Sequence, residues 1–355
     1  MSLKISNFHK KYFSELAFKL AEINKYKTAE NPSVGCVVTN YNNDIISKGF
    51  TSIGGRPHAE TNALKNISSK IIKRMFVTLE PCCHFGKTPP CTRIIKKKNI
   101  KNIYIYNKDP NFLVNGKGIS FLKRNKINCT IKINNNHFYK QYNYSVKSKF
   151  PFVTSKLAIT KKYNTVVNTK KYFTSEQALK FAHLQRYQND SILVGKNTFL
   201  KDMPKLNCRI DGLEKFSPKI FIINKDLDFN KKNLTNTSKK IFVIHSCQNQ
   251  NKVLRFSKIF NLIKLKNING LIDPKDILMK IYQLGLRRLL IEGGVKTLNL
   301  FQKQKLINKF IFIKSCENIS NTRNSAKFLI DAASSKNLNK YRVNINLSNN
   351  ELFII

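Results

Sequence analysis

Three residues in the first hundred positions combine the types and the spacing that a catalytic zinc site needs. His58 begins the run His58-Ala59-Glu60 directly after a Gly-Gly-Arg-Pro turn, and Cys82 and Cys91 each follow a proline. A catalytic zinc ion takes three nitrogen, sulfur or oxygen ligands from the protein and leaves one position for water. The pattern therefore predicts a zinc site built from His58, Cys82 and Cys91.

Glu60 stands two residues after His58, where it can lie beside the water without binding the metal. One neutral imidazole and two thiolates cancel the charge of zinc, and water in such a site reaches a pKa of about 7. In nucleobase deaminases a carboxylate takes the proton of the attacking water and delivers it to the ring nitrogen and to the leaving ammonia. We therefore expect Glu60 to be the catalytic acid/base.

Cys83 and His84 lie next to Cys82 and compete with it as ligands. Simultaneous ligation by two adjacent cysteines is awkward, so we interpret Cys83 as structural. A single His-x-Glu or Cys-Cys pair carries little information. Their combination with two Pro-Cys steps on a strand–turn–helix pattern is improbable by chance.

The cysteine distribution indicates a metal or catalytic site rather than a disulfide framework. Three of the eight cysteines fall within ten residues, and the other five stand singly. This clustering favours a reducing compartment. The N-terminus has no apolar core of signal-peptide length, and no apolar run approaches the ~20 residues that span a bilayer. We therefore expect a soluble cytoplasmic protein with no membrane partner.

The length of 355 residues and the order of apolar segments predict two α/β domains. A helix at 7–27 is followed by strands at 34–38, 44–50, 75–79, 103–106 and 129–133, with helices near 58, at 91–98 and after 118. The polar segment 139–149, ended by Pro151, places the boundary between domains 1–149 and 150–355. The alternation then starts again, with strands at 152–157, 191–194, 219–223, 241–245 and 288–291 and helices at 175–188, after 274 and after 294.

The formal net charge of +44 would ordinarily suggest a nucleic-acid partner. Here the lysines are spread through the whole chain and mixed with asparagines, whereas a dedicated surface usually shows a concentrated basic helix or arm. We interpret the charge as solvated surface and expect no specific nucleic-acid partner. The sequence is compatible with a homo-oligomer.

The loop between Cys82 and Cys91 holds eight residues, Cys-His-Phe-Gly-Lys-Thr-Pro-Pro, where most zinc deaminases close with Pro-Cys-x-x-Cys. This expanded form resembles the bifunctional riboflavin biosynthesis deaminase/reductase family. The resemblance covers nearly the whole chain. It is most specific at Asn31–Gly35, Pro57–Glu60, Thr78–Cys91 and Asp109–Asn111.

The resemblance implies a cytidine-deaminase-like three-layer domain followed by a dihydrofolate-reductase-like α/β domain. It implies zinc-dependent deamination of diaminohydroxyphosphoribosylaminopyrimidine. The ribosyl group of 5-amino-6-(5-phosphoribosylamino)uracil is then reduced to ribityl by NADPH. The partners are thus small phosphoribosylaminopyrimidine substrates, and the resemblance makes four residues of the first domain candidate substrate contacts: Asn31, His84, Lys87 and Asp109.

In the second domain, Glu292-Gly293-Gly294 stands between a predicted strand and a helix, where a turn can present backbone N–H groups to an anion. A plain strand-to-helix turn explains this run equally well. By resemblance, the substrate phosphate is held by Lys156, Arg186, Leu206, Arg209 and Glu292. The cofactor is faced by Tyr172, Thr198, Asp202 and Gly294.

The second domain also departs from the family pattern. Thr160-Lys161-Lys162-Tyr163 stands where Ser-Leu-Asp-Gly is usual, Tyr172 stands for a Trp, and Met203 for an Asp. A deaminase with an inactive C-terminal domain kept for assembly is therefore one alternative. A tRNA or single-stranded nucleic-acid deaminase with a basic second domain is another, although polymer deaminases tend to the short Cys-x-x-Cys form.

We predict that the protein binds tRNA or single-stranded DNA weakly and without sequence preference, with Kd about 10⁻⁴–10⁻⁶ M at physiological salt. Diffuse charge binds phosphates through released counterions, so the affinity falls steeply as salt rises. Fluorescence anisotropy at low and physiological salt measures it. Tight, sequence-selective binding that survives physiological salt would instead favour the polymer deaminase.

Overall fold

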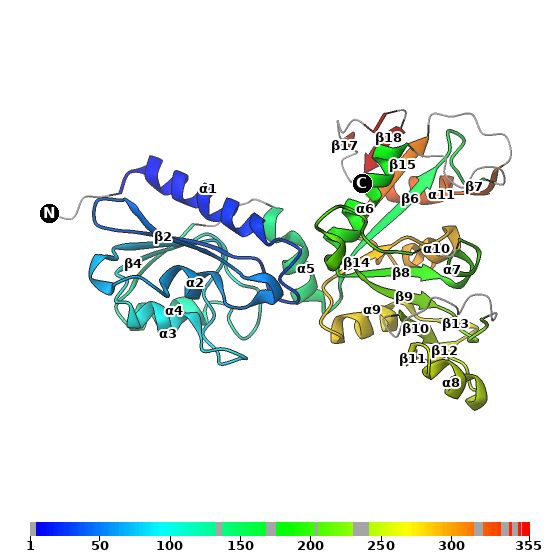
Figure 1. Cartoon of the computed structure of the whole chain (residues 1–355), viewed down its shortest axis with the longest axis horizontal. Helices are drawn as coiled ribbons and strands as arrows, with labels where there is room; N and C mark the ends of the chain where they lie inside the picture. Colours follow the sequence, from blue (N-terminus) through cyan, green and yellow to red (C-terminus); the bar gives the residue numbers. More distant parts are fainter. Residues whose placement is uncertain are drawn as a thin grey trace. The chain divides into compact units, whose positions relative to one another are not determined.

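The computed structural model describes residues 5–132, 137–167, 175–202, 205–229, 241–315, 322–334, 341–342, 347–348 and 350–355 (Figure 1). The chain divides into two compact units, Met1–Ser148 and Lys149–Ile355. Within the described residues, no helix has the length and apolar character needed to cross a bilayer.

The first unit is built on a mixed sheet of five strands in the order β2-β1-β3-β4-β5. β1 is antiparallel to β2 and β3, whereas β3, β4 and β5 are parallel. The strands are β1 (Gly35–Thr39), β2 (Ile45–Phe50), β3 (Arg74–Val77), β4 (Asn102–Ile105) and β5 (Asn128–Ile131). The helices are α1 (Asn7–Ile23), α2 (Ala59–Leu64), α3 (Cys91–Lys97), α4 (Lys117–Arg124) and α5 (Lys140–Ser148).

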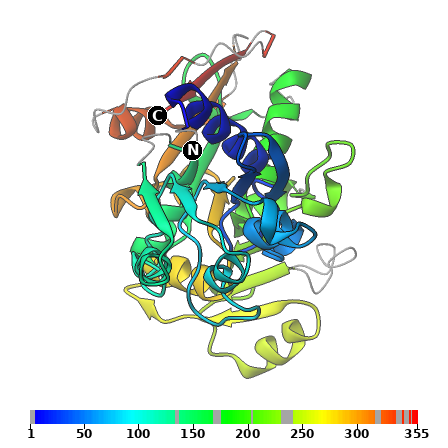
Figure 2. The same ribbon diagram turned by 90° about the vertical axis from the view of Figure 1, so that its left-hand side faces the viewer.

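Helices cover both faces of this sheet, which makes a three-layer arrangement. In Figures 1 and 2, α1 (dark blue) lies on one face and α2, α3 and α4 lie on the other. Because both faces are covered, β1 and β3 are buried at every position. The side chain of Ser6 starts α1 by accepting a hydrogen bond from the backbone N–H of His9, which satisfies a donor in the helix's first turn.

Four local features of this unit converge on one edge of the sheet. His58 is the N-cap of α2, and Cys91 is the first residue of α3. The loop after β3 carries Cys82, and the loop after β4 carries Asp109. Since β3 and β4 are parallel, their carboxyl ends lie at the same edge. Residues far apart in the sequence are thus brought to one place.

The second unit is built on nine strands in the order β11-β10-β9-β8-β14-β6-β15-β18-β17. The first seven run parallel, and β18 and β17 continue the sheet antiparallel. The strands are β6 (Phe152–Ile159), β8 (Ser191–Gly195), β9 (Lys219–Ile223), β10 (Ile241–His245), β11 (Asn261–Lys264), β14 (Arg288–Ile291), β15 (Lys309–Ser315), β17 (Tyr341–Arg342) and β18 (Asn350–Ile354). Two small pairs accompany it: β12 (Asn267–Ile268) with β13 (Leu271–Ile272), and β7 (Asn164–Val167) with β16 (Thr322–Ser325).

Its helices are α6 (Glu176–Gln188), α7 (Lys196–Asp202), α8 (Gln250–Ser257), α9 (Pro274–Gln283), α10 (Val295–Lys303) and α11 (Lys327–Ser334). Alternate residues of the central strands enter different apolar clusters. Leu193 and Leu289 belong to one, and Ile192 and Leu290 to another. Because side chains alternate between the faces of a strand, both faces of this sheet carry a core. The α/β class expected from the sequence is confirmed.

We predict that Gly35→Ala destabilises the first unit by about 3 kcal/mol, the upper end of ordinary overpacking costs. A Cβ on Gly35 would lie 1.8 Å from the backbone oxygen of Ala17, so α1 would have to move away from β1. The thermal unfolding midpoint of the variant measures the loss. The matched control is Gly86→Ala, whose Cβ would meet nothing closer than 3.8 Å. Equal midpoints for the two variants would contradict the prediction.

Candidate functional site

The side chains of His58, Cys82 and Cys91 meet at the carboxyl edge of the first sheet. Their ligand atoms all lie within 4.8 Å of one another. Among the described residues, this is the one cluster of three or more His, Cys, Asp or Glu side chains placed closely enough to hold a metal ion. Nδ1 of His58 lies 3.6 Å from Sγ of Cys82 and 3.3 Å from Sγ of Cys91. The backbone N–H of Cys91 also donates to Sγ of Cys82, at 3.3 Å.

The charges of this cluster suit a metal with nitrogen and sulfur ligands. The hydrogen bond from the Cys91 side chain, with others from His58 and the Cys91 backbone, lowers the pKa of Cys82 to about 4. Cys82 is therefore a thiolate at neutral pH. The same contact with Cys82, together with burial, holds the pKa of Cys91 well above its ordinary value. Hydrogen bonding to Cys82 raises the pKa of His58. The donor set is that of a catalytic zinc site.

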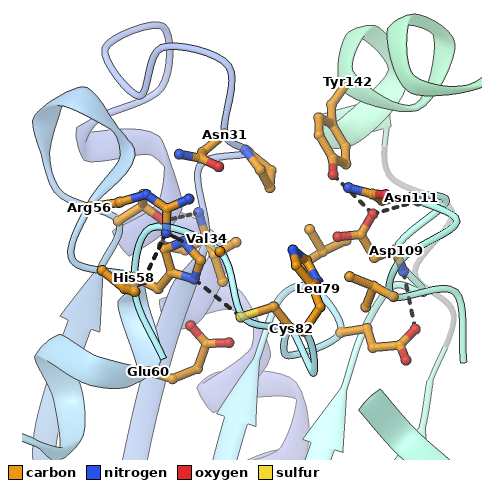
Figure 3. Close-up of a pocket in the computed structure, with 17 residues that line it drawn as sticks. Asn31, Val34, Arg56, His58, Glu60, Leu79, Cys82, Asp109, Asn111 and Tyr142 are labelled. Carbon is orange, nitrogen blue, oxygen red and sulfur yellow. Dashed lines mark hydrogen bonds between the residues drawn. The ribbon is translucent and has the colours of Figure 1, made fainter. Parts of the chain in front are cut away.

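Glu60 lies in the first turn of α2, beside the cluster (Figure 3). Its side chain is buried, and burial raises the pKa of the carboxyl while the nearby His58 opposes that rise. A carboxyl whose pKa is raised by burial holds a proton more readily than a free carboxyl does, as is usual for a catalytic acid/base. Glu60 thus has the place and the protonation behaviour of an acid/base group.

A pocket opens beside this cluster, and three of the four predicted substrate contacts line it. Asn31, His84 and Asp109 lie on its wall together with His58, Glu60 and Cys82. Nδ1 of His84 is buried and makes no hydrogen bond among the described residues. This nitrogen therefore has no partner within the described part of the protein.

Lys87 does not line this pocket and is exposed. The sequence alone indicated a cation in this loop, but not whether it lines the pocket.

Asp109 is held in the pocket by neighbours on two sides. Its Oδ1 accepts a hydrogen bond from the hydroxyl of Tyr142, on α5, at 2.9 Å, and another from the backbone N–H of Asn111 at 2.9 Å. Burial nevertheless raises the pKa of Asp109 to about 6. Tyr142 and Asn111 also line the pocket (Figure 3), and neither was among the predicted contacts.

Arg56, in the turn before His58, also lines the pocket and was not among the predicted contacts. Its Nη1 donates to Oγ1 of Thr88 at 2.8 Å and lies 3.3 Å from Nε2 of His58. Of the pocket-lining residues it is the one with a permanent positive charge. Its position two residues before His58 was the signal available in the sequence.

Glu80 anchors the loop that carries Asp109. Its buried carboxylate accepts hydrogen bonds from the backbone N–H groups of Asp109, Gly116 and Ile119, at 3.4, 3.0 and 3.2 Å. Sγ of Cys83 donates to the carbonyl oxygen of Leu113 in the same loop, at 3.5 Å. These contacts fit a structural role for Cys83.

The second unit holds a separate polar cluster made by β6, α6 and the turn after β14. Nε and Nη2 of Arg186 donate to the two carboxylate oxygens of Glu292 at 3.0 and 2.8 Å, a bidentate ion pair. Burial alone would raise the pKa of Glu292, but the charges of Arg186 and Lys156 prevail and lower it. Burial lowers the pKa of Lys156.

The remaining predicted phosphate contacts lie on the loop after α7. Arg209 is exposed there, whereas Leu206 is buried with φ +51°. Nη1 of Arg186 donates to the carbonyl oxygen of Asn207 at 3.1 Å, which joins this loop to the ion pair. All three nitrogens of the Arg186 guanidinium thus donate hydrogen bonds to other groups of the protein.

Two of the four predicted cofactor contacts are adjacent in the structure. A Cβ on Gly294, at the start of α10, would lie 3.7 Å from Oγ1 of Thr198 in α7. Both residues follow parallel strands at their carboxyl ends, where open α/β sheets bind ligands. Tyr172 and the departure at Met203 lie outside the described residues, as does the side chain of Asp202. Lys161, Lys162 and Tyr163 lie in the exposed turn between β6 and β7.

Comparison with known proteins defines the class. Residues 8–107 match the cytidine and deoxycytidylate deaminase zinc-binding region, and residues 151–315 match the RibD C-terminal domain. A zinc-binding deaminase region followed by this reductase domain is the organisation of a bifunctional deaminase/reductase.

The chain is 32% identical over 309 residues to the riboflavin biosynthesis protein RibD of Aquifex aeolicus (strain VF5), covering 85% of both chains. It therefore belongs to the RibD family of bifunctional riboflavin biosynthesis enzymes, whose cofactors are zinc and NADPH. The expected family, enzyme class and cofactors are confirmed.

Solved structures show the same fold over the whole chain. Acinetobacter baumannii RibD, form 2, superposes with a TM-score of 0.83 at 24% identity, covering 98% of each chain. A diaminohydroxyphosphoribosylaminopyrimidine deaminase/5-amino-6-(5-phosphoribosylamino)uracil reductase from Thermotoga maritima superposes with a TM-score of 0.75 at 23% identity, again over 98% of each chain. The expected order of a deaminase-like and a reductase-like fold is confirmed.

We predict that the purified protein holds about one zinc per chain and that Cys82→Ser or Cys91→Ser loses it, since the site offers three ligands and no spare. The reason is that a missing thiolate leaves two protein donors. Metal analysis by plasma mass spectrometry measures the content. The matched control is Cys83→Ser, which removes the neighbouring thiol and should keep the metal. Loss of zinc from the Cys83 variant with retention in the Cys82 variant would reverse the assignment.

Proposed function

We propose that residues 1–149 deaminate diaminohydroxyphosphoribosylaminopyrimidine by hydrolysis, with His58, Cys82 and Cys91 as zinc ligands and Glu60 as the acid/base. The observation that carries the proposal is the convergence of these four side chains beside one pocket. Zinc bound there supplies Lewis acidity, which makes water a stronger nucleophile near neutral pH.

Glu60 performs the proton transfers of this reaction. Its carboxylate takes a proton from the attacking water and passes it to the ring nitrogen as the new carbon–oxygen bond forms. It then takes the second proton, from the hydroxyl on the ring carbon, and passes it to the amino group, so that ammonia leaves and the oxygen remains as a carbonyl. Burial favours the protonated form of Glu60 once the proton has moved, because a buried carboxylate has lost its hydration. The group can therefore act as base and then as acid within one turnover.

Asn31, His84 and Asp109 are the residues we propose to contact the pyrimidine and its sugar. Each lines the pocket, and the amide, imidazole and carboxylic acid together offer both donors and acceptors. Tyr142 and Asn111 hold Asp109 in place. Lys87, exposed beyond the pocket wall, remains a candidate for the distal phosphate of the sugar.

We propose that residues 150–355 reduce the ribosyl group of 5-amino-6-(5-phosphoribosylamino)uracil to ribityl, with NADPH supplying the hydride and solvent a proton. Thr198 and Gly294 border the cofactor, with Tyr172 and Asp202 as further candidates. Lys156, Arg209, Leu206 and the Arg186–Glu292 pair border the substrate. The changes at Lys161, Lys162 and Tyr163 lie in an exposed turn, where substitution is tolerated, and this supports an active reductase.

We predict that Glu60→Gln lowers deamination by about 10²–10⁴-fold, the usual contribution of a general acid/base group, and leaves reduction unchanged. The amide keeps the shape of the side chain but cannot accept the proton. Supplying the diaminopyrimidine phosphate and NADPH and identifying the products by mass measures the first activity. Supplying the aminouracil phosphate and following NADPH absorbance measures the second.

The variant thus carries its own control, since the two activities use different units. Zinc content equal to that of the wild type shows that the metal site is intact. Near-normal deamination by Glu60→Gln would assign the proton transfer to another group. Failure of the wild-type protein to oxidise NADPH with the aminouracil phosphate would leave only the deaminase.

A further inference from the structure

His183, on α6, forms hydrogen bonds to the loop after α7 at both ring nitrogens. Nδ1 lies 3.1 Å from the carbonyl oxygen of Asn207, and Nε of Arg209 donates to Nε2 at 3.2 Å. The ring is nearly buried. His183 is neither a predicted nor an assigned site residue, and it stands one helical turn before Arg186 on the same face of α6.

Three contacts at the ring favour the tautomer with the proton on Nδ1, because that tautomer satisfies two of them. With the proton on Nδ1, the ring donates to Asn207 and accepts from Arg209, so both contacts are hydrogen bonds. In this tautomer the backbone N–H of Arg209, 3.2 Å from Nδ1, has no acceptor on the ring. With the proton on Nε2, that backbone contact would be the one hydrogen bond made, because the ring would have no donor for Asn207 and two N–H groups would face each other at 3.2 Å between Nε2 and Arg209. Burial, with the charges of Arg186 and Arg209, lowers the pKa of His183 and keeps the ring neutral.

The hydrogen bond to His183 uses one donor of the Arg209 guanidinium and leaves the terminal donors for other groups. Nε is used by His183, while the two terminal nitrogens make no hydrogen bond among the described residues and the side chain is exposed. Arg186 is the opposite case, because Nε and Nη2 serve Glu292 and Nη1 serves Asn207. Of the two arginines, Arg209 is therefore the one that can offer a planar pair of donors to a phosphate.

We propose that His183 is a positioning residue, which orients the guanidinium of Arg209 through Nε so that its terminal nitrogens bind the phosphate of the reductase substrate. The inference rests on the proposed function of the second unit. It assigns the orientation of the phosphate-binding group to a neutral histidine that itself touches no substrate.

A pair of substitutions separates this role from a purely structural one. In His183→Gln the amide oxygen stands near the place of Nε2 and can accept from Arg209, but the donor to Asn207 is lost. In His183→Asn the amide nitrogen stands near the place of Nδ1 and can donate to Asn207, but the acceptor for Arg209 is lost. The two variants therefore each keep one of the two contacts.

We predict that His183→Asn raises the KM for 5-amino-6-(5-phosphoribosylamino)uracil about tenfold with little change in kcat, as expected for a lost hydrogen bond to a charged group. His183→Gln should stay within about threefold of the wild type, since it keeps the bond to Arg209. Initial rates of NADPH oxidation by the full-length protein measure both constants. Inorganic phosphate, as a competitive inhibitor, should weaken in His183→Asn and not in His183→Gln.

An Arg209→Lys background supplies the remaining control, because lysine has no Nε–H for His183 to orient. There, His183→Asn should add nothing further to KM. A KM unchanged in His183→Asn, or raised equally in both variants, would overturn the inference and assign His183 to holding the loop. Wild-type protein that does not oxidise NADPH would instead overturn the proposed function. Equal thermal midpoints for the variants show that a difference in KM is not a folding defect.

Discussion

Burial of several ionisable groups within a few ångströms of each other is the constraint on which the first unit depends. Cys91 and Glu60 are buried, with Cys82 and His58 half-buried beside them, and an uncompensated charge at a buried site costs several kcal/mol. Within the protein, the cluster relieves this by sharing protons between Cys82 and Cys91. A divalent cation relieves it further, because two thiolates and one imidazole then neutralise the metal. Metal binding and deprotonation of the cluster are therefore linked.

The surrounding fold keeps this cluster and its pocket in one geometry. The buried strands β1 and β3 form a floor that cannot shift without losing packing, and Gly35 lets α1 lie directly against that floor. Glu80 draws the Asp109 loop toward the same edge by accepting three backbone hydrogen bonds. The sheet and the loops that follow β3 and β4 thus hold the pocket in place.

The second unit also buries charged groups, and it compensates each of them with a neighbouring group of opposite charge. Arg186 and Glu292 neutralise each other, and the charge of Lys156 lies close to the pair. Because the guanidinium of Arg186 is satisfied within the protein, it organises the site, while the exposed Arg209 is available to an anion. The neutral ring of His183 connects the two arginines without adding charge between them. A protonated imidazole there would repel both.

Residue types and local spacing determined the zinc ligands proposed here, Glu60, the α/β class and most helices and strands, because ligand chemistry and apolar periodicity are written in short segments. The wide sheet of the second unit was less visible: β15 and β18 join it through pairings between residues distant in sequence. Only the tertiary structure decided that Lys87 does not line the pocket and that Arg56, Tyr142 and Glu80 do. It also decided that Arg186 binds Glu292 and that His183 holds Arg209. Such roles depend on the direction of a side chain and on its partner across the fold, and neither is fixed by the residue's neighbours in the chain.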